Sequence, residues 1–210
     1  MKYFFTIILL IPIICFSQET IEQQLDSISS SEEATSFLKA NKPKQGKLFT
    51  FNRAKHKTRL ANDLFNLAKG GKKVIKTDFK KTYYKIIDKS EVMFSRFDII
   101  VFDASNTSTK EAKAKRNKVL ALHKEGYRFK DLAKHNSSGP TAKMGGDTGW
   151  IKSGDMSTAF DEIAFNKTHA IGEVFTIDDI ENNKYYLVVK TEAKTAIEEI
   201  IVLKFSEELE

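Results

Sequence analysis

The sequence predicts an α+β protein in which a small antiparallel sheet is covered by helices, and three segments support this prediction. Residues 92–102 are rich in β-branched and aromatic side chains, as expected of a strand. Residues 109–125 place Ala112, Val119 and Leu122 on one face of a helix. Residues 184–191 have the composition of a second strand. Such a sheet buries one face under helices.

Residues 18–90 form a mixed N-terminal region that begins with two predicted helices. Apolar residues lie at i, i+4 and i+7 on the face of the first helix, at Ile21, Leu25 and Ile28. Ser30 and Glu33 have the spacing of a capping box that starts the second helix, and Pro43 ends it.

A strand, KLFTF, and a third helix follow in the same region. The helix carries its apolar face on Leu60, Leu64, Leu67 and Ala68 and is expected to stop at Gly70 and Gly71. The next run, 71–89, interleaves lysines with aromatic and β-branched residues. It fits either a basic surface for an anionic polymer or a half-buried strand whose lysines protect an edge, and the second interpretation is favoured.

The later elements are delimited by similar signals. Ser108 with Glu111 caps the long helix, and Gly126 ends it. Shorter helices are expected at 129–136 and 158–165. The pattern of the tail AIEEIIVLKF favours a strand over a helix, and we expect this strand to pair with KLFTF.

The first 17 residues are typical of a cleaved signal peptide, with one lysine, a short apolar run and Cys-Phe-Ser before Gln18. This predicts an exported protein, periplasmic or secreted, without stable membrane insertion after cleavage. Cys15 is alternatively a lipid-anchoring cysteine, although Ile13 and Ile14 fit that poorly. Cleavage after Ser17 removes the only cysteine, and with it any disulfide or cysteine-metal site.

The charge and motifs exclude several function classes. The formal net charge of +6 is a mild basic excess, which does not indicate a nucleic-acid partner. The glycine-rich stretch GGDTGW lacks the Lys-Ser/Thr of a phosphate loop. Its glycines, Gly145, Gly146 and Gly149, fit a tight turn that Asp147 caps. No metal or cofactor is implied.

The ordered series of motifs from about 91 to 192 resembles the parvulin-type, PpiC-like peptidyl-prolyl isomerases. The series comprises the strand, the long helix, Gly126, the Phe-x-x-Leu-Ala pattern of Phe129, Leu132 and Ala133, GGDTGW, GEVF and the final strand. The resemblance implies a parvulin-like domain at 91–192, with 193–210 as a C-terminal strand extension.

The resemblance also implies a chemistry, rotation about an X-Pro amide, whose barrier is roughly 18–20 kcal/mol. Such catalysis needs an apolar cradle for the proline ring, exclusion of water and polar groups matched to the twisted carbonyl. Met156 and Phe160 match two cradle positions of the family, and Thr148 stands at the third, usually leucine. Outside this context, Met156 and Phe160 would be read as plain core.

The family's polar positions differ in this sequence. Asp98 and Tyr186 stand where the family has histidines, or Tyr185 if the register shifts by one, and they are the candidate catalytic residues. Gly139 stands where a cysteine or aspartate usually faces the carbonyl. We hypothesise that the Tyr186 hydroxyl donates to the Asp98 carboxylate in place of the histidine pair. His135 is the histidine nearest the site, and a solvated role is favoured for it.

The long helix carries several lysines, whereas the loop DASNTST before it has none. Some relatives use a basic cluster in that loop to read phosphorylated residues before proline, so the lysines here are expected to be a solvated face.

Two functions follow from the resemblance. The first is an exported isomerase acting on X-Pro bonds of unfolded, nascent or folding envelope proteins, weakly active if the polar substitutions matter. The alternative is a catalytically degenerate chaperone or client-binding module with the same fold.

Overall fold

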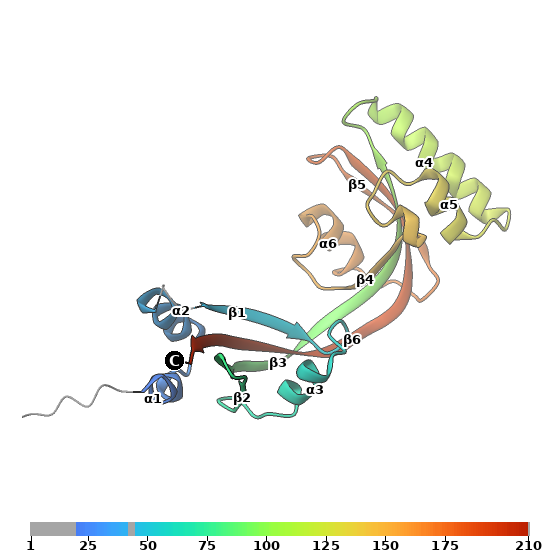
Figure 1. Ribbon diagram of the computed structural model, residues 1–210. Helices are drawn as coiled ribbons and strands as arrows, with labels where there is room; N and C mark the ends of the chain where they lie inside the picture. Colours follow the sequence, from blue (N-terminus) through green and yellow to red (C-terminus); the bar gives the residue numbers. More distant parts are fainter. Residues whose placement is uncertain (1–19, 42–44, 210) are drawn as a thin grey trace, which may run out of the picture.

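The computed structural model describes residues 20–41 and 45–209 as two lobes joined by two long strands (Figure 1). The first lobe contains α1 (Ile21–Ser27), α2 (Ser31–Ala40), β1 (Gln45–Asn52), α3 (Arg59–Phe65) and β2 (Lys72–Lys76). The second contains α4 (Thr109–Lys124), α5 (Phe129–Asn136), the 3₁₀ turn η1 (Ala142–Met144), β4 (Asp147–Ile151), α6 (Thr158–Ala164) and β5 (Val174–Asp179). The predicted signal peptide and Pro43 lie outside the described residues.

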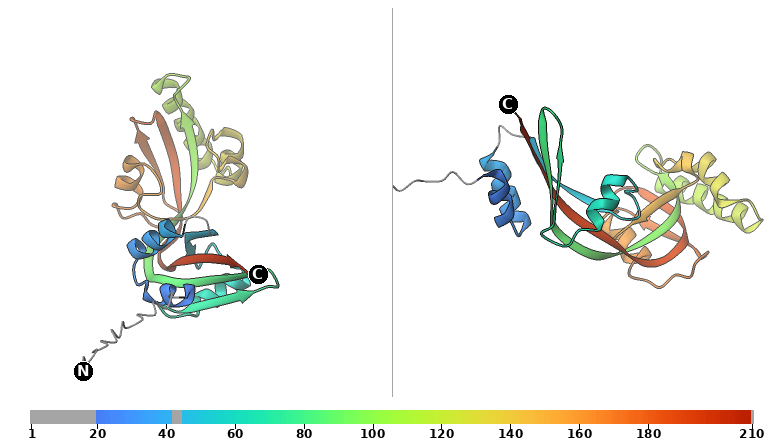
Figure 2. Two further views of the ribbon diagram at one scale, coloured as in Figure 1. Left: turned by 60° about the vertical axis from the view of Figure 1, so that its left-hand side comes forward. Right: turned by 60° about the horizontal axis from the view of Figure 1, so that its bottom comes forward.

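The joining strands, β3 (Lys80–Asp103) and β6 (Lys184–Glu208), pair antiparallel along their whole lengths. Their pairing shifts register between Ile86 and Asp88 and again near Arg96, and such bulges bend a sheet. The two strands curve together from one lobe to the other (Figure 2). The predicted strands at 92–102 and 184–191 are therefore confirmed, but each continues far into the first lobe.

The sheet order in the first lobe is β1-β6-β3-β2, with β4 added beside β3 and β5 beside β6 in the second. The predicted pairing of the tail with KLFTF is confirmed, because Leu48 lies opposite Leu203 and Phe49 opposite Val202. The sequence boundaries proposed at 90/91 and 192/193 fall inside β3 and β6.

Helices cover both faces of the sheet in the first lobe. Leu25 of α1 and Phe37 of α2 pack with Phe205 on one face, whereas Leu64 of α3 packs with Ile86 on the other. The expected capping box at Ser30 is present.

The third helix is shorter than predicted, because α3 ends at Phe65 rather than at Gly70. The Lys89 ammonium donates to the carbonyl oxygens of Phe65, the last helical residue, at 2.7 Å and of Leu67, just beyond the helix, at 3.3 Å.

The lysine-rich run forms the β2–β3 hairpin, in which the aromatic residues Tyr83 and Tyr84 are buried. Four of its lysines are paired with acidic residues: Lys72 with Asp26, Lys73 with Asp63, Lys81 with Glu22 and Lys89 with Glu198. The strand interpretation of this run is confirmed.

The second lobe has a core on each side of its sheet. On one side, Ile100 and Leu187 pack against Val119 of α4 and Leu132 of α5. On the other side, Phe97, Val101 and Val188 pack with α6. The helices predicted at 109–125, 129–136 and 158–165 are confirmed to within a residue, as is the capping box of Ser108 and Glu111. Within the described ranges, no helix is both long and apolar enough to cross a membrane.

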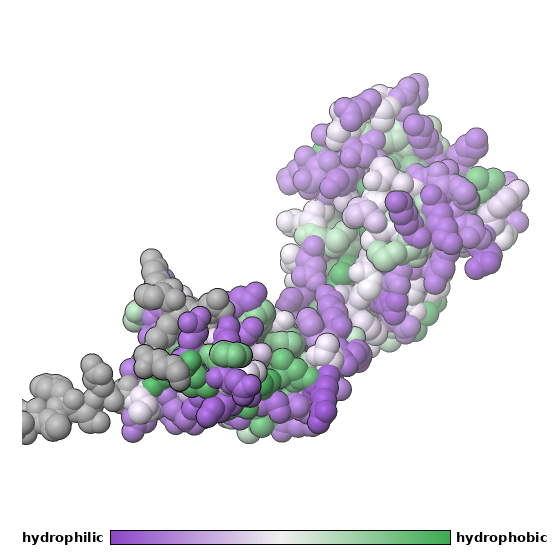
Figure 3. All heavy atoms as spheres, in the orientation of Figure 1, coloured by the Kyte–Doolittle hydropathy of each residue, from purple (hydrophilic) through white to green (hydrophobic). Residues whose placement is uncertain are grey.

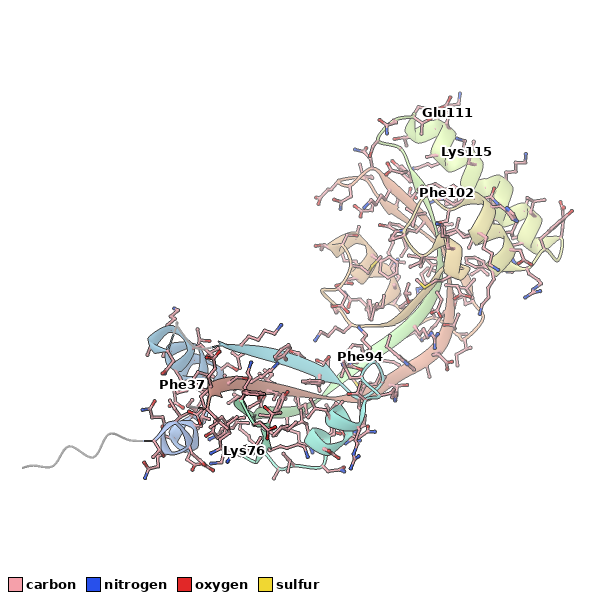
Figure 4. The ribbon with its side chains drawn as sticks, in the orientation of Figure 1. Phe37, Lys76, Phe94, Phe102, Glu111 and Lys115 are labelled. Atoms are coloured by element: carbon pink, nitrogen blue, oxygen red, sulfur yellow. The ribbon has the colours of Figure 1, made fainter. Side chains whose placement is uncertain are left out.

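Glu199 makes polar contacts with an element of each lobe at the bend. Its carboxylate accepts from Asn52 at the end of β1, at 3.1 Å, and from Lys152 after β4, at 2.9 Å. The Phe94 ring lies at this junction (Figure 4), with the Lys152 ammonium 5.7 Å from its centroid. These contacts join an element of each lobe to β6.

Candidate functional site

A pocket of about 390 Å³ opens on the α6 side of the sheet in the second lobe. Its apolar wall consists of Ile99, Val101, Ile151 and Met156, and its polar lining includes Ser138, Thr141, Thr148 and Tyr186. Asp103 and Lys184, which lie opposite each other on β3 and β6, complete the lining with Gly139 and Pro140. The volume is in the range of small-ligand sites, so the pocket can hold a proline ring with part of its neighbours.

The glycine turn brings β4 against β3 at one side of the pocket. Gly145, Gly146 and Gly149 all have positive φ, at 74°, 91° and 63°. A Cβ on Gly146 would lie 2.5 Å from the carbonyl oxygen of Ile99, and the Ile99 N–H donates to the Gly146 carbonyl at 2.9 Å. Glycine is therefore required at 146 by both backbone conformation and space.

Asp147 holds this turn to β3. Its carboxylate accepts from Nε of Arg96 at 2.8 Å, from a second Arg96 nitrogen, and from the Gly149 N–H at 2.8 Å. The hydrogen bonds from Arg96 outweigh partial burial and lower the pKa of Asp147. The Asp147 carboxylate thus stays ionised and braces the turn.

Thr148 lines the pocket, but its hydroxyl is bonded to the backbone. The hydroxyl oxygen accepts from the Phe97 N–H at 3.1 Å and lies 3.0 Å from the Phe97 carbonyl oxygen, to which it can donate. The Thr148 hydroxyl, at this expected cradle position, therefore takes the place of a backbone hydrogen bond between β4 and β3.

The two other predicted cradle residues lie at different depths. Met156 precedes α6, is half-buried and lines the pocket. Phe160 is 0% exposed and does not contribute to the lining. Its ring lies beneath Tyr186, with centroids 5.6 Å apart, and beside Phe97 at 5.8 Å. Phe160 supports the pocket from below, and Met156 forms its surface.

The two candidate catalytic residues lie on opposite faces of the sheet, and the hypothesised hydrogen bond between them is wrong. Tyr186 lies opposite Val101 on the pocket side, whereas Asp98 lies opposite Val189. Positions 98 and 101 are an odd number of residues apart on one strand, so their side chains project from different faces. The structure brings Tyr186 into the pocket and leaves Asp98 outside its lining.

Tyr186 is 4% exposed, and its hydroxyl makes no side-chain hydrogen bond within the described residues. Burial, with the nearby carboxylates of Asp179 and Asp103, raises the pKa of Tyr186 to about 12. The hydroxyl therefore keeps its proton at physiological pH and is available as a donor. Tyr185, the alternative position, faces the other side and bonds the Thr109 hydroxyl at 3.0 Å.

The carbonyl-facing position Gly139 lines the pocket and has no room for a side chain, because a Cβ there would lie 2.6 Å from Cγ2 of Val101. Its neighbours supply hydroxyls that sequence reasoning missed. Ser138 donates to the Val101 carbonyl at 2.9 Å. Thr141 has a buried hydroxyl with no partner in the part of the chain described. The only sequence signal for them was their adjacency to Gly139. His135 is exposed and lies outside the lining.

Asp98 is a buried carboxyl, 6% exposed, on the α5 side of β3. Burial raises its pKa, and the charge of Asp147 adds to this, while Lys130 and Arg96 oppose it. The charged carboxylate is thus less favourable in the folded than in the unfolded chain.

We expect Asp98→Asn to raise the free energy of unfolding at neutral pH, because the substitution removes the penalty of a buried charge. A raised folded-state pKa means that the wild-type penalty is absent below the unfolded pKa and grows as pH rises through the folded pKa. Urea unfolding at several pH values measures this. Asp147→Asn is the control with the opposite sign, because the pKa of Asp147 is lowered and its stabilisation is lost as pH falls. A loss of stability in Asp98→Asn at neutral pH would contradict the conclusion that the buried Asp98 carboxylate destabilises the folded chain.

Comparison with known proteins places this geometry in a family. A family model described as the PPIC-type PPIase domain matches residues 80–195. Chaperone SurA of Idiomarina loihiensis is 35% identical over 96 residues, which cover 43% of this chain and 22% of the relative. Chaperone SurA of Saccharophagus degradans is 39% identical over 59 residues, covering 28% and 14%. The chain thus spans less than a quarter of the length of either relative.

Similar solved structures each cover about half of the chain. PrsA from Bacillus subtilis is 30% identical, covers 49% of this chain and 36% of its own, and has a TM-score of 0.40. A PpiC-type peptidyl-prolyl isomerase domain is 22% identical, covers 50% and 94%, and has a TM-score of 0.45. Because the family model matches more than half of the residues, the protein belongs to the PPIC-type, parvulin, family of peptidyl-prolyl isomerase domains.

Proposed function

We propose that this protein is an exported peptidyl-prolyl cis-trans isomerase that acts on X-Pro bonds of unfolded or folding envelope proteins. The observation that carries the proposal is the pocket, in which an apolar wall containing Met156 and Ile151 faces the free hydroxyl of Tyr186. The composition of residues 1–17 supports export.

In the proposed mechanism, the proline ring lies against Val101, Ile151 and Met156. Removing water from the amide weakens its resonance, because the planar, charge-separated form loses hydration. The Tyr186 hydroxyl then donates to the substrate carbonyl, and the orphan hydroxyl of Thr141 gains a partner. No covalent step and no cofactor takes part.

Tyr186→Phe is expected to lower kcat/KM for an X-Pro peptide about tenfold, which corresponds to the loss of about 1.4 kcal/mol of transition-state stabilisation. Tyr185→Phe is the matched control, because it removes the neighbouring hydroxyl from the opposite face of the sheet. Exchange spectroscopy of the peptide measures both variants. Equal rates in Tyr186→Phe and the wild type would exclude the hydroxyl from the mechanism.

The second candidate function is a client-binding chaperone with little catalysis. It is favoured by the replacement of the family's histidines by Asp98 and Tyr186, and by the position of Asp98 outside the pocket. Under this alternative, peptides bind in the pocket but their cis/trans exchange is no faster than in buffer.

A further inference from the structure

Positive charge is concentrated on the helices that cover one face of the second lobe. Residues 109–144, which span α4, α5 and η1, contain ten lysines and arginines against three acidic residues, a net charge of +7. The whole chain has a net charge of +6, so this segment accounts for the entire basic excess. The hydrophilic surface along this side is visible in Figure 3.

Three of these cations are already paired. Lys113 and Arg116 bind Asp178, and Arg128 binds Asp131. Seven exposed lysines have no ion pair within the described residues. They are Lys110, Lys115, Lys118 and Lys124 on α4, with Lys130, Lys134 and Lys143 on α5 and η1. We call these seven the basic surface.

The acidic residues of segment 109–144 do not neutralise the basic surface. Glu111 lies at the start of α4 near Lys115 (Figure 4), but its carboxylate is bonded to Thr107 and to the Ser108 N–H in the cap. Lys115 is attracted by the charge of Glu111, and Lys130 by those of Asp98 and Asp147, but no ammonium group of the basic surface is held in an ion pair among the described residues.

The basic surface is continuous with the pocket along the chain. α5 ends at Asn136, the next residues Ser138 to Thr141 line the pocket, and Lys143 follows on η1. A polypeptide that leaves the pocket past Thr141 first meets Lys143, and it must pass the edge of the sheet to reach the lysines of α4 and α5, which cover the opposite face. The pocket itself is not basic, because Asp103 lies opposite Lys184 in the lining and Asp179 adds a carboxylate near Tyr186.

We propose that the basic surface binds acidic stretches of the same unfolded polypeptide whose X-Pro bond occupies the pocket. This rests on the function proposed for the pocket and specifies its substrates: acidic residues several positions from the proline rather than next to it. A second contact on one chain raises the overall affinity through effective concentration, and opposite charge speeds association.

A polypeptide fits this surface better than a lipid membrane does. A helix that lies in a membrane interface needs a broad apolar face beside its lysines. Here the large exposed apolar side chains at α4, α5 and η1 are Tyr127 and Met144. Charge without an apolar face suits a flexible acidic chain.

The test uses the full chain and three labelled peptides with one X-Pro bond. In the first, four glutamates follow the proline after a spacer of about five residues, each spanning up to about 3.5 Å. In the second, glutamines replace the glutamates, and in the third the glutamates adjoin the proline. We expect the first to bind about tenfold more tightly than the other two at low salt, as measured by fluorescence anisotropy, and to lose this advantage at high salt.

The variant K115E/K118E/K143E should remove the advantage, whereas K57E/K76E/K194E, with the same charge change on exposed lysines elsewhere, should retain it. If the first variant fails to fold, the corresponding glutamine variant is measured instead.

Equal affinity for the glutamate and glutamine peptides, or equal losses in both triple variants, would overturn the proposal. Lysine-dependent binding to phosphatidylglycerol vesicles without a preference for the spaced acidic peptide would also overturn it, in favour of a membrane. Failure of the proposed isomerase function is distinguishable, because it appears as absent exchange of the glutamine peptide while binding of the glutamate peptide is still measured.

Discussion

Replacing Phe160 by alanine is expected to lower the free energy of unfolding by about 3–5 kcal/mol, the usual cost of removing a buried phenyl ring. Phe160 is fully buried, and its ring contacts Phe97, Phe165 and Tyr186 edge-on or tilted at centroid distances of 5.6 to 6.4 Å. Removing the Phe160 ring would leave a cavity directly beneath Tyr186. We therefore expect the shape of the pocket to change as well.

Phe160→Leu is the graded control, because it keeps most of the volume and should cost clearly less. Phe175→Ala is the positional control, since that ring is only partly buried and lies 6.5 Å from Phe97. Denaturant unfolding measures all three. A loss below about 1 kcal/mol in Phe160→Ala, the range of peripheral substitutions, would show that the ring does not support the pocket.

Gly146→Ala is expected to cost about 2–5 kcal/mol, combining a left-handed conformation with overpacking. The added Cβ would lie 2.5 Å from the Ile99 carbonyl oxygen and 2.9 Å from its nitrogen, both backbone atoms that cannot rotate away. β4 must then separate from β3, which moves Thr148 out of the pocket wall.

Gly149→Ala supplies the matched control in the same turn. Gly149 has a φ of 63°, but no atom lies within 4 Å of its ideal Cβ, so only the conformational cost of about 1–2 kcal/mol applies. Hydrogen exchange of the Ile99 amide, which donates to Gly146, separates the two variants. Retained protection of this amide in Gly146→Ala would contradict the close packing of the turn.

Local signals in the sequence predicted much of the fold. Capping boxes at Ser30 and Ser108 placed two helix starts correctly, because they depend on side chains three residues apart. The length of β3 and β6 could not be predicted, because it depends on partners more than a hundred residues away and on bulges that no short motif encodes. α3 ends earlier than its apolar pattern predicted, and the carbonyl oxygen of its last residue, Phe65, is bound by Lys89 of β3, a contact that the local pattern does not encode.

The sequence predicted which segments form the candidate site, but not which face of the sheet each of their side chains occupies. Tyr186 and Asp98 lie on neighbouring strands as expected, yet a register difference of one residue decides which side of a sheet a residue faces. The sequence therefore did not separate the pocket-facing Tyr186 from Asp98. Gly139 looked like a lost polar group, whereas the structure has no space for a side chain there and places Ser138 and Thr141 beside it.

Cis/trans exchange of a short, uncharged X-Pro peptide in the presence of the wild-type protein tests the central claim most directly. Exchange spectroscopy resolves the two isomers, whose uncatalysed interconversion takes tens to hundreds of seconds at 25 °C. We predict that the protein accelerates exchange in proportion to its concentration. Exchange as slow as in buffer, with the peptide demonstrably bound in the pocket, would contradict the isomerase function and leave the chaperone.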